Sequence, residues 1–194
     1  MVFLPTGDPD AFAMIFEWLY REKISAFQGI GSGSTEETTQ PYFIRHNKAM
    51  STLLKIYSMA LLWEMNGLSD LIMNHIGKDY FSTPRWPARE EFTAAYHLTR
   101  SGCGLRLFMA RTYNYMLLTC KDNATPGEVS STKELIRIAD MLPSLKEDSF
   151  KSLRGIMSSG SSKLLDPVTD MVCDYHEHGK QRACQYQGKA FTGM

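Results

Sequence analysis

The sequence has no surplus of either charge. Its 194 residues include 21 Lys or Arg and 21 Asp or Glu, which gives a formal net charge of zero. Proteins that bind nucleic acids through the phosphates carry clustered basic residues, because neutralising the phosphates releases counterions. The sequence has neither a basic surplus nor a run of like charges, so it predicts no nucleic-acid partner.

Long apolar runs are also missing. Polar residues interrupt every apolar segment well before the roughly 20 residues that a membrane-spanning helix needs. The first residues, MVFLPTGDPDAF, lack the basic and apolar segments of a secretory signal. The four cysteines, Cys103, Cys120, Cys173 and Cys184, are too few and too scattered for a disulfide scaffold. We therefore expect a soluble intracellular protein, in the cytoplasm or nucleus, with reduced thiols and no membrane partner.

Familiar catalytic signatures are absent too. The sequence contains neither a Gly-x-Ser-x-Gly elbow nor a His-Glu-x-x-His motif, and its Gly/Ser-rich stretch lacks the Gly-Lys-Ser/Thr ending of a phosphate-binding loop. Glu90 and Glu91 are adjacent, so on a helix they face different directions. Cys103 lies between two glycines, in a turn, and no base for it can be identified. We predict no enzymatic activity.

What the sequence does contain is helical periodicity. Asp8-Pro9 predicts the start of a helix, because Asp8 can accept hydrogen bonds from first-turn N–H groups and proline fits the first helical position. Apolar residues follow at helical spacing and predict a core face. That face comprises Phe12, Ile15, Phe16 and Leu19.

Further helices are expected along the chain, so the fold class is mainly α, a helical bundle. The expected ranges are 46–63, 68–80, 88–98, 105–119, 131–142, 144–158 and a last helix from Asp166-Pro167 through CDYHEHG. Asn66-Gly67 is expected to end the second helix, with Gly67 as a left-handed cap. Ser131 and Ser144 each precede a glutamate by three residues, which predicts two capping boxes. The core faces expected on these helices include Met50, Leu53, Leu54, Tyr57, Ala60, Leu61, Leu68, Leu71, Ile72, His75, Ile76, Phe92, Ala95, Tyr96, Leu105, Phe108, Met109, Thr112, Tyr113, Met116 and Leu117.

Two blocks are expected. Residues 1–120 are the richer in aromatic and apolar side chains, and they include a flexible Gly/Ser/Thr-rich loop at about 25–41. The segment DNATPGE separates them from residues 121–194, a helical extension with a frayed tail. The sequence leaves open whether this extension packs on the first block.

Three segments, in this order, resemble the second half of a BTB/POZ domain of the kind found in filamentous fungi. They are DPDAFAMIFEWLYREKI, LLKIYSMALLWEMNGLSDLIMNHI and AYHLTRSGCGLRLF, within residues 3–115, with a weaker echo at CDYHEHG. The chain departs from the family pattern at Arg21-Glu22, where a glycine is usual. The matching positions are Asp8, Pro9, Phe12, Trp18, Leu19 and Tyr20, then Leu54, Tyr57, Ala60, Met65 and Leu68, then Tyr96, Thr99, Gly102, Leu105 and Arg106.

The resemblance implies a non-enzymatic protein-interaction module or adaptor. Its partners would be a second copy of the chain, another BTB-type protein or a cullin-type scaffold protein. The strands and helices that open a BTB fold have no counterpart here, so we expect helices that normally pack on them to expose apolar surface. The other interpretation is that the chain is a truncated BTB protein without independent function.

A Cys/His cluster near the end of the sequence is the strongest chemical candidate. Cys173, His176, His178 and Cys184 offer two thiols and two imidazoles within twelve residues, the ligand set that zinc binds as a tetrahedron. On a helix Cys173 and His176 would share a face, whereas His178 would point elsewhere unless the helix ends near Glu177. The interpretation that we favour is a polar helix end whose histidines favour the helix dipole, with no bound metal or cofactor. The alternative is a small helical zinc-binding protein.

Overall fold

The computed structural model describes residues 8–21, 24, 42–83, 85–120, 129–158, 164, 166–169, 172–178 and 184. Within these residues it contains α-helices and no strand, which confirms the mainly-α prediction. The helices are α1 (Pro9–Arg21), α2 (Tyr42–Leu62), α3 (Asn66–Ser82), α4 (Arg89–Leu98), α5 (Gly104–Thr119), α6 (Thr132–Met141) and α7 (Pro143–Ser158), followed by the short 3₁₀ helix η2 (Val172–Tyr175).

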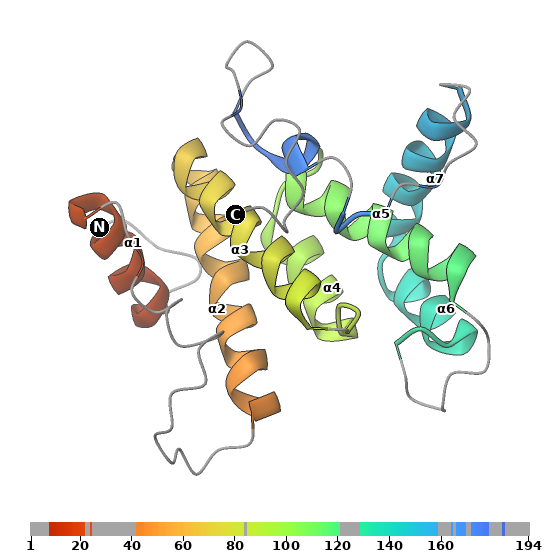
Figure 1. Cartoon of the computed structure of the whole chain (residues 1–194), viewed down its shortest axis with the longest axis horizontal. Helices are drawn as coiled ribbons and strands as arrows, with labels where there is room; N and C mark the ends of the chain where they lie inside the picture. Colours follow the sequence, from red (N-terminus) through yellow and green to blue (C-terminus); the bar gives the residue numbers. More distant parts are fainter. Residues whose placement is uncertain are drawn as a thin grey trace.

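The helices form a continuous array (Figure 1). α1 lies at one end and packs on α2, which in turn packs on α3 and α4. α5 occupies the other half, where it contacts α4, α6, α7 and η2. One cluster of buried apolar side chains runs from α1 to α7, so the helices of the second block pack on the first.

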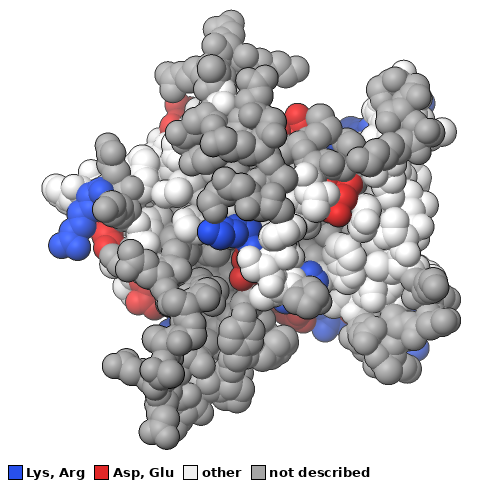
Figure 2. Space-filling view, viewed as in Figure 1, with Lys and Arg blue, Asp and Glu red and all other residues white. Residues whose placement is uncertain are grey.

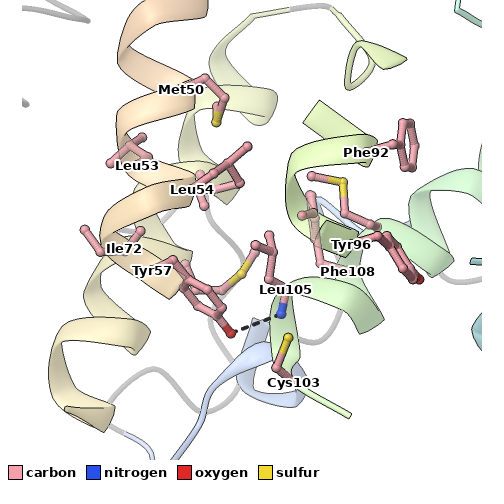
Figure 3. Packing of buried hydrophobic residues seen from close by; sticks show 14 of the residues in the cluster. Met50, Leu53, Leu54, Tyr57, Ile72, Phe92, Tyr96, Cys103, Leu105 and Phe108 are labelled. Carbon is pink, nitrogen blue, oxygen red and sulfur yellow. Dashed lines mark hydrogen bonds between the residues drawn. The ribbon is translucent and has the colours of Figure 1, made fainter. Parts of the chain in front are cut away.

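The predicted core faces are largely correct. The faces expected on α2 and α4 are buried, as are the expected positions of α5 except Leu117, which is exposed. Figure 3 shows Leu54 and Tyr57 of α2 pointing toward Leu105 and Phe108 of α5. On α3, Leu71 and His75 are only half-buried.

The core face predicted for α1 is only partly correct. Ala11 and Ile15 are fully buried against the bundle, whereas Phe16 is 42% and Leu19 54% exposed. The helix contacts the bundle mainly through α2, so one narrow stripe of it is covered. The helix start is confirmed, because Asp8 Oδ1 accepts hydrogen bonds from the N–H groups of Asp10 and Ala11 at 3.0 and 3.3 Å.

The corner between α2 and α3 differs from the prediction. Gly67 lies inside the first turn of α3, and Glu64 is the residue that adopts the left-handed conformation, with φ of 55°. The Met65 N–H donates to the Ala60 carbonyl at 2.8 Å and the Glu64 N–H to Leu61 at 3.3 Å. This pair of bonds is a Schellman motif, which normally carries glycine at the left-handed position.

Two capping boxes were predicted, and the structure confirms the helix start at one of them. The Ser131 hydroxyl accepts a hydrogen bond from the Glu134 N–H, and α6 begins at the next residue. α7 begins at Pro143, so Ser144 lies inside the helix and the predicted start at Ser144 is wrong. Proline fits this position because it has no N–H to leave unpaired.

Residues of the segment AYHLTRSGCGLRLF meet at the corner between α4 and α5. The Arg106 guanidinium donates to the backbone carbonyl of Tyr96 at 2.6 Å and also to the carbonyl of Thr99. It lies over the Tyr96 ring, 4.8 Å from its centroid. Gly102, in the intervening turn, has φ of 81°, a conformation that favours glycine. These matching positions therefore have a structural role, which is to fix one helix against the next.

The expected loop at 25–41, the DNATPGE segment and the tail after Cys184 lie outside the described residues. None of the described helices is long and apolar enough to cross a membrane. On the face shown in Figure 2, the basic and acidic side chains of the described residues are scattered, and neither sign gathers into a patch.

His75 predicts a pH dependence of stability. Burial in α3, with a smaller contribution from Lys78, lowers the pKa of its imidazole from 6.5 to about 4. Between these values the unfolded chain binds a proton that the folded chain does not, so the free energy of unfolding falls as the pH drops from 6.5 toward 4. We expect His75→Gln to flatten this part of a plot of melting temperature against pH. An unchanged slope would show that His75 does not contribute to it.

Candidate metal centre

The segment that carries the Cys/His cluster is not the helix that the sequence predicts. Asp166 Oδ1 accepts a hydrogen bond from the Val168 N–H at 2.9 Å, but only a turn follows it at 167–169. Helical structure then returns as the single 3₁₀ turn η2, which ends at Tyr175. Because the helix stops there, His178 is free of the helical spacing that would have turned it away from Cys173.

The structure brings all four candidate ligands together. One ligand atom from each of Cys173, His176, His178 and Cys184 lies within 4.8 Å of the others. Cys173 Sγ is 3.6 Å from His178 Nε2, and His176 Nδ1 is 3.3 Å from Cys184 Sγ. Tetrahedral zinc places a sulfur and a nitrogen ligand about 3.5 Å apart, given its usual bond lengths. These two sulfur–nitrogen separations therefore match the edges of a zinc tetrahedron.

His176 is oriented by a residue that the sequence did not point to. Its Nε2 lies 2.9 Å from Oδ1 of Asn74, a buried side chain of α3. Since an amide oxygen only accepts, Nε2 carries the proton and the lone pair of Nδ1 faces Cys184. A hydrogen bond of this kind fixes the tautomer of most metal-binding histidines. An asparagine in the middle of a helix gives no sequence signal for this role.

Burial sets the protonation of the unloaded centre. It lowers the pKa of His176 to about 4, which keeps the imidazole in its neutral, ligating form. It raises the pKa of the Cys173 thiol to about 11, with the neighbouring Cys184 adding to the shift. A metal that binds here must therefore displace thiol protons.

Glu177, between the two histidines, attaches the segment to the helices. Its Oε1 accepts hydrogen bonds from the Tyr57 hydroxyl at 2.7 Å and from the Gly104 N–H at 2.6 Å. Its own N–H donates to Asp70 Oδ1 at 2.5 Å. The Tyr57 hydroxyl in turn accepts from the Leu105 N–H at 3.1 Å, as Figure 3 shows. The segment is thus bonded to α2, α3 and the start of α5.

Tyr175 completes this attachment by packing. Its side chain is fully buried, and its ring meets that of Phe108 edge to face at 5.3 Å. The Tyr175 backbone lies directly over Gly104, where an added Cβ would come within 1.9 Å of the Tyr175 carbonyl oxygen. Only glycine at position 104 leaves room for this approach. The adjacent glycines around Cys103 marked a turn in the sequence but did not reveal what would cover it.

The arrangement is suited to holding a metal rather than to bond chemistry. Four protein ligands fill a tetrahedral zinc ion, whereas catalytic zinc keeps one position open for water. The other residues considered for chemistry do not come together among the described residues. Cys103 is 1% exposed and burial raises its pKa, while Glu91 is held in an ion pair with Arg85 at 3.0 Å.

The chain was compared with protein-family models, with curated proteins and with solved structures. It matches none of them. The candidate metal centre therefore stands on its own geometry.

Proposed function

We propose that this chain is a non-enzymatic helical module whose fold is completed by a structural zinc ion. The observation that carries the proposal is the convergence of two thiols and two imidazoles, with one ligand atom from each within 4.8 Å of the others. Mixed sulfur and nitrogen ligands in this number favour zinc over magnesium or calcium, which prefer oxygen.

The ion would hold the segment 173–178 in the conformation that contacts the helices. Cys173, His176 and His178 flank the residues that contact the helices, since Tyr175 packs on Phe108 and Glu177 binds Tyr57 and Gly104. Fixing the ligands therefore fixes these contacts as well. Because zinc binds the folded segment and not a preformed site in the unfolded chain, its binding free energy adds to folding stability.

The test is zinc content and zinc-dependent stability. We expect the purified chain to contain one zinc per molecule by elemental mass spectrometry, and a chelator to lower its melting temperature. Asn74→Ala should weaken zinc binding roughly 10- to 100-fold, because His176 loses the group that orients it. Cys120→Ser, a thiol outside the cluster, is the matched control and should bind zinc normally. A zinc-free chain that melts sharply and ignores chelator would refute the proposal.

A second candidate function is protein interaction, as the BTB/POZ resemblance implies. The observation that favours it is a row of aromatic rings, the α1 ridge, formed by Trp63, Phe12, Phe16 and Tyr20. Successive ring centroids are 6.4, 4.7 and 6.3 Å apart. Tyr20 is 82% and Phe16 42% exposed, and an exposed aromatic row of this kind is typical of a binding surface.

The first partner to test for the α1 ridge is a second copy of the chain. We expect concentration-dependent self-association by analytical ultracentrifugation, weakened at least 10-fold by Phe16→Ala with Tyr20→Ala, since aromatic anchors contribute more than about 1 kcal/mol each. The matched control is Phe150→Ala with Met157→Ala, two exposed apolar residues of α7 at 66% and 77%. A monomer at all concentrations, or equal weakening by both pairs, would count against self-association through this ridge.

A further inference from the structure

The two sulfurs of the metal centre belong to residues that can reach each other. Cys173 and Cys184 each place Sγ in the same cluster, within the 4.8 Å that separates its ligand atoms. Cys173 is half-buried, whereas Cys184 is 9% exposed. One sulfur thus belongs to a partly exposed residue, and the other, within 4.8 Å of it, belongs to a buried one.

We propose that this pair is a peroxide-sensitive modification site: a hydroperoxide converts the two thiolates into a Cys173–Cys184 disulfide and expels the zinc. The inference rests on the proposed zinc centre, because zinc keeps both sulfurs deprotonated while it is bound. The thiolate is the form of cysteine that attacks a peroxide.

The reaction balances in two steps. The Cys173 sulfur attacks the outer oxygen of the hydroperoxide, the O–O bond breaks, and a proton completes the departing alcohol or water, leaving a sulfenic acid. The Cys184 thiolate then attacks the Cys173 sulfur, forming the S–S bond and releasing hydroxide, which takes up a proton as water. Two sulfurs lose one electron each, and the peroxide gains both.

Loss of zinc follows from the ligand count. A disulfide no longer offers thiolates, so only His176 and His178 remain, and two neutral imidazoles do not make a closed zinc site. One zinc ion would therefore be released for each disulfide formed. The Asn74 contact of His176 does not involve sulfur and would not itself be broken by the oxidation.

The other two cysteines are placed differently. Cys103 and Cys120 flank α5 at opposite ends, so they lie about 25 Å apart at the helical rise per residue. They cannot form a disulfide with each other in the folded chain. Cys103 is also 1% exposed and out of contact with solvent peroxide.

The experiment uses the zinc-loaded chain and hydrogen peroxide. A chromogenic chelator measures released zinc, and mass spectrometry of peptides maps the cysteines. We expect one zinc released per disulfide, a linked peptide joining Cys173 to Cys184, and recovery after dithiothreitol and zinc. Cys120→Ser should behave identically. Cys184→Ser removes the second thiol, so no linked peptide should form in this variant.

The outcomes separate the two proposals. Zinc that stays bound while Cys120 is oxidised, or zinc lost without the Cys173–Cys184 link, would overturn the peroxide-sensitive site and leave the structural zinc ion standing. A reduced chain that binds no zinc would overturn both.

Discussion

Replacing Gly104 with alanine should destabilise the protein by about 3 kcal/mol, at the upper end of the usual cost of overpacking. The new Cβ would lie 1.9 Å from the carbonyl oxygen and 2.4 Å from the carbonyl carbon of Tyr175. Both are backbone atoms, so no rotamer change relieves the clash. The segment around Tyr175 would have to leave α5, with loss of its packing on Phe108 and of the Glu177 hydrogen bonds.

The matched control for this change is Gly155→Ala in α7. Apart from its chain neighbours and the backbone of its own helix, no atom lies within 4 Å of the Cβ that it would add. Only helix propensity therefore acts, and we expect a gain of about 0.5–1 kcal/mol. Gly104 is the first residue of α5, where the interior cost of glycine does not apply in full, so propensity alone predicts no loss of stability there. Opposite signs in urea unfolding would therefore isolate the contact with Tyr175. A gain at both positions would show that the segment does not sit on Gly104 in solution.

Glu91→Ala should also cost about 3 kcal/mol or more. The Glu91 carboxylate is 7% exposed and accepts four hydrogen bonds, from the Tyr80 hydroxyl at 2.8 Å, from both terminal nitrogens of Arg85 at 3.0 Å and from the Ala88 N–H at 2.6 Å. Removing Glu91 takes away the shorter of two ion pairs of Arg85, which keeps Asp79 at 3.4 Å, and leaves the Ala88 N–H without its side-chain acceptor. Burial raises the pKa of Tyr80, so its hydroxyl remains protonated and loses its acceptor as well.

The neighbouring Glu90 provides the control. Its side chain is 74% exposed and forms a surface ion pair with Arg89 at 3.3 Å, so we expect Glu90→Ala to change stability by less than about 0.5 kcal/mol. Glu91→Gln tests the charge separately, because it keeps the size of the side chain. If Glu91→Ala and Glu90→Ala had similar unfolding midpoints in urea, the ion pair would not support the junction between α3 and α4.

Local patterns predicted the helices well because their signals lie in neighbouring residues. Asp8-Pro9 marked the start of α1, and the apolar face of α2 follows from its spacing. The exposure of Phe16 and Leu19 could not be predicted in this way, since spacing shows which residues share a face but not whether another element covers that face. Nor does the sequence show that Glu64 takes the conformation usually left to glycine, which depends on how α2 and α3 meet.

The sequence likewise predicted one part of the candidate metal centre and missed another. The ligand types were readable from twelve residues, but their convergence depended on where the last helical turn ends, a boundary that sequence patterns place poorly. Asn74 contacts His176, which is 102 positions away in the sequence, and Gly104 contacts Glu177, which is 73 positions away. No local signal links such distant residues.

The difference in sequence separation between the ligands and their distant contacts has a kinetic consequence. The cost of closing a chain loop grows with the number of residues in it, so the ligands close at a smaller cost than the contacts of His176 with Asn74 or of Glu177 with Gly104. The ligand loop can therefore form early, as a unit, while its docking waits until α3 and α5 have met. The helices fold and the ligand loop closes as separate events. Zinc binds the closed loop before the loop docks on the helices.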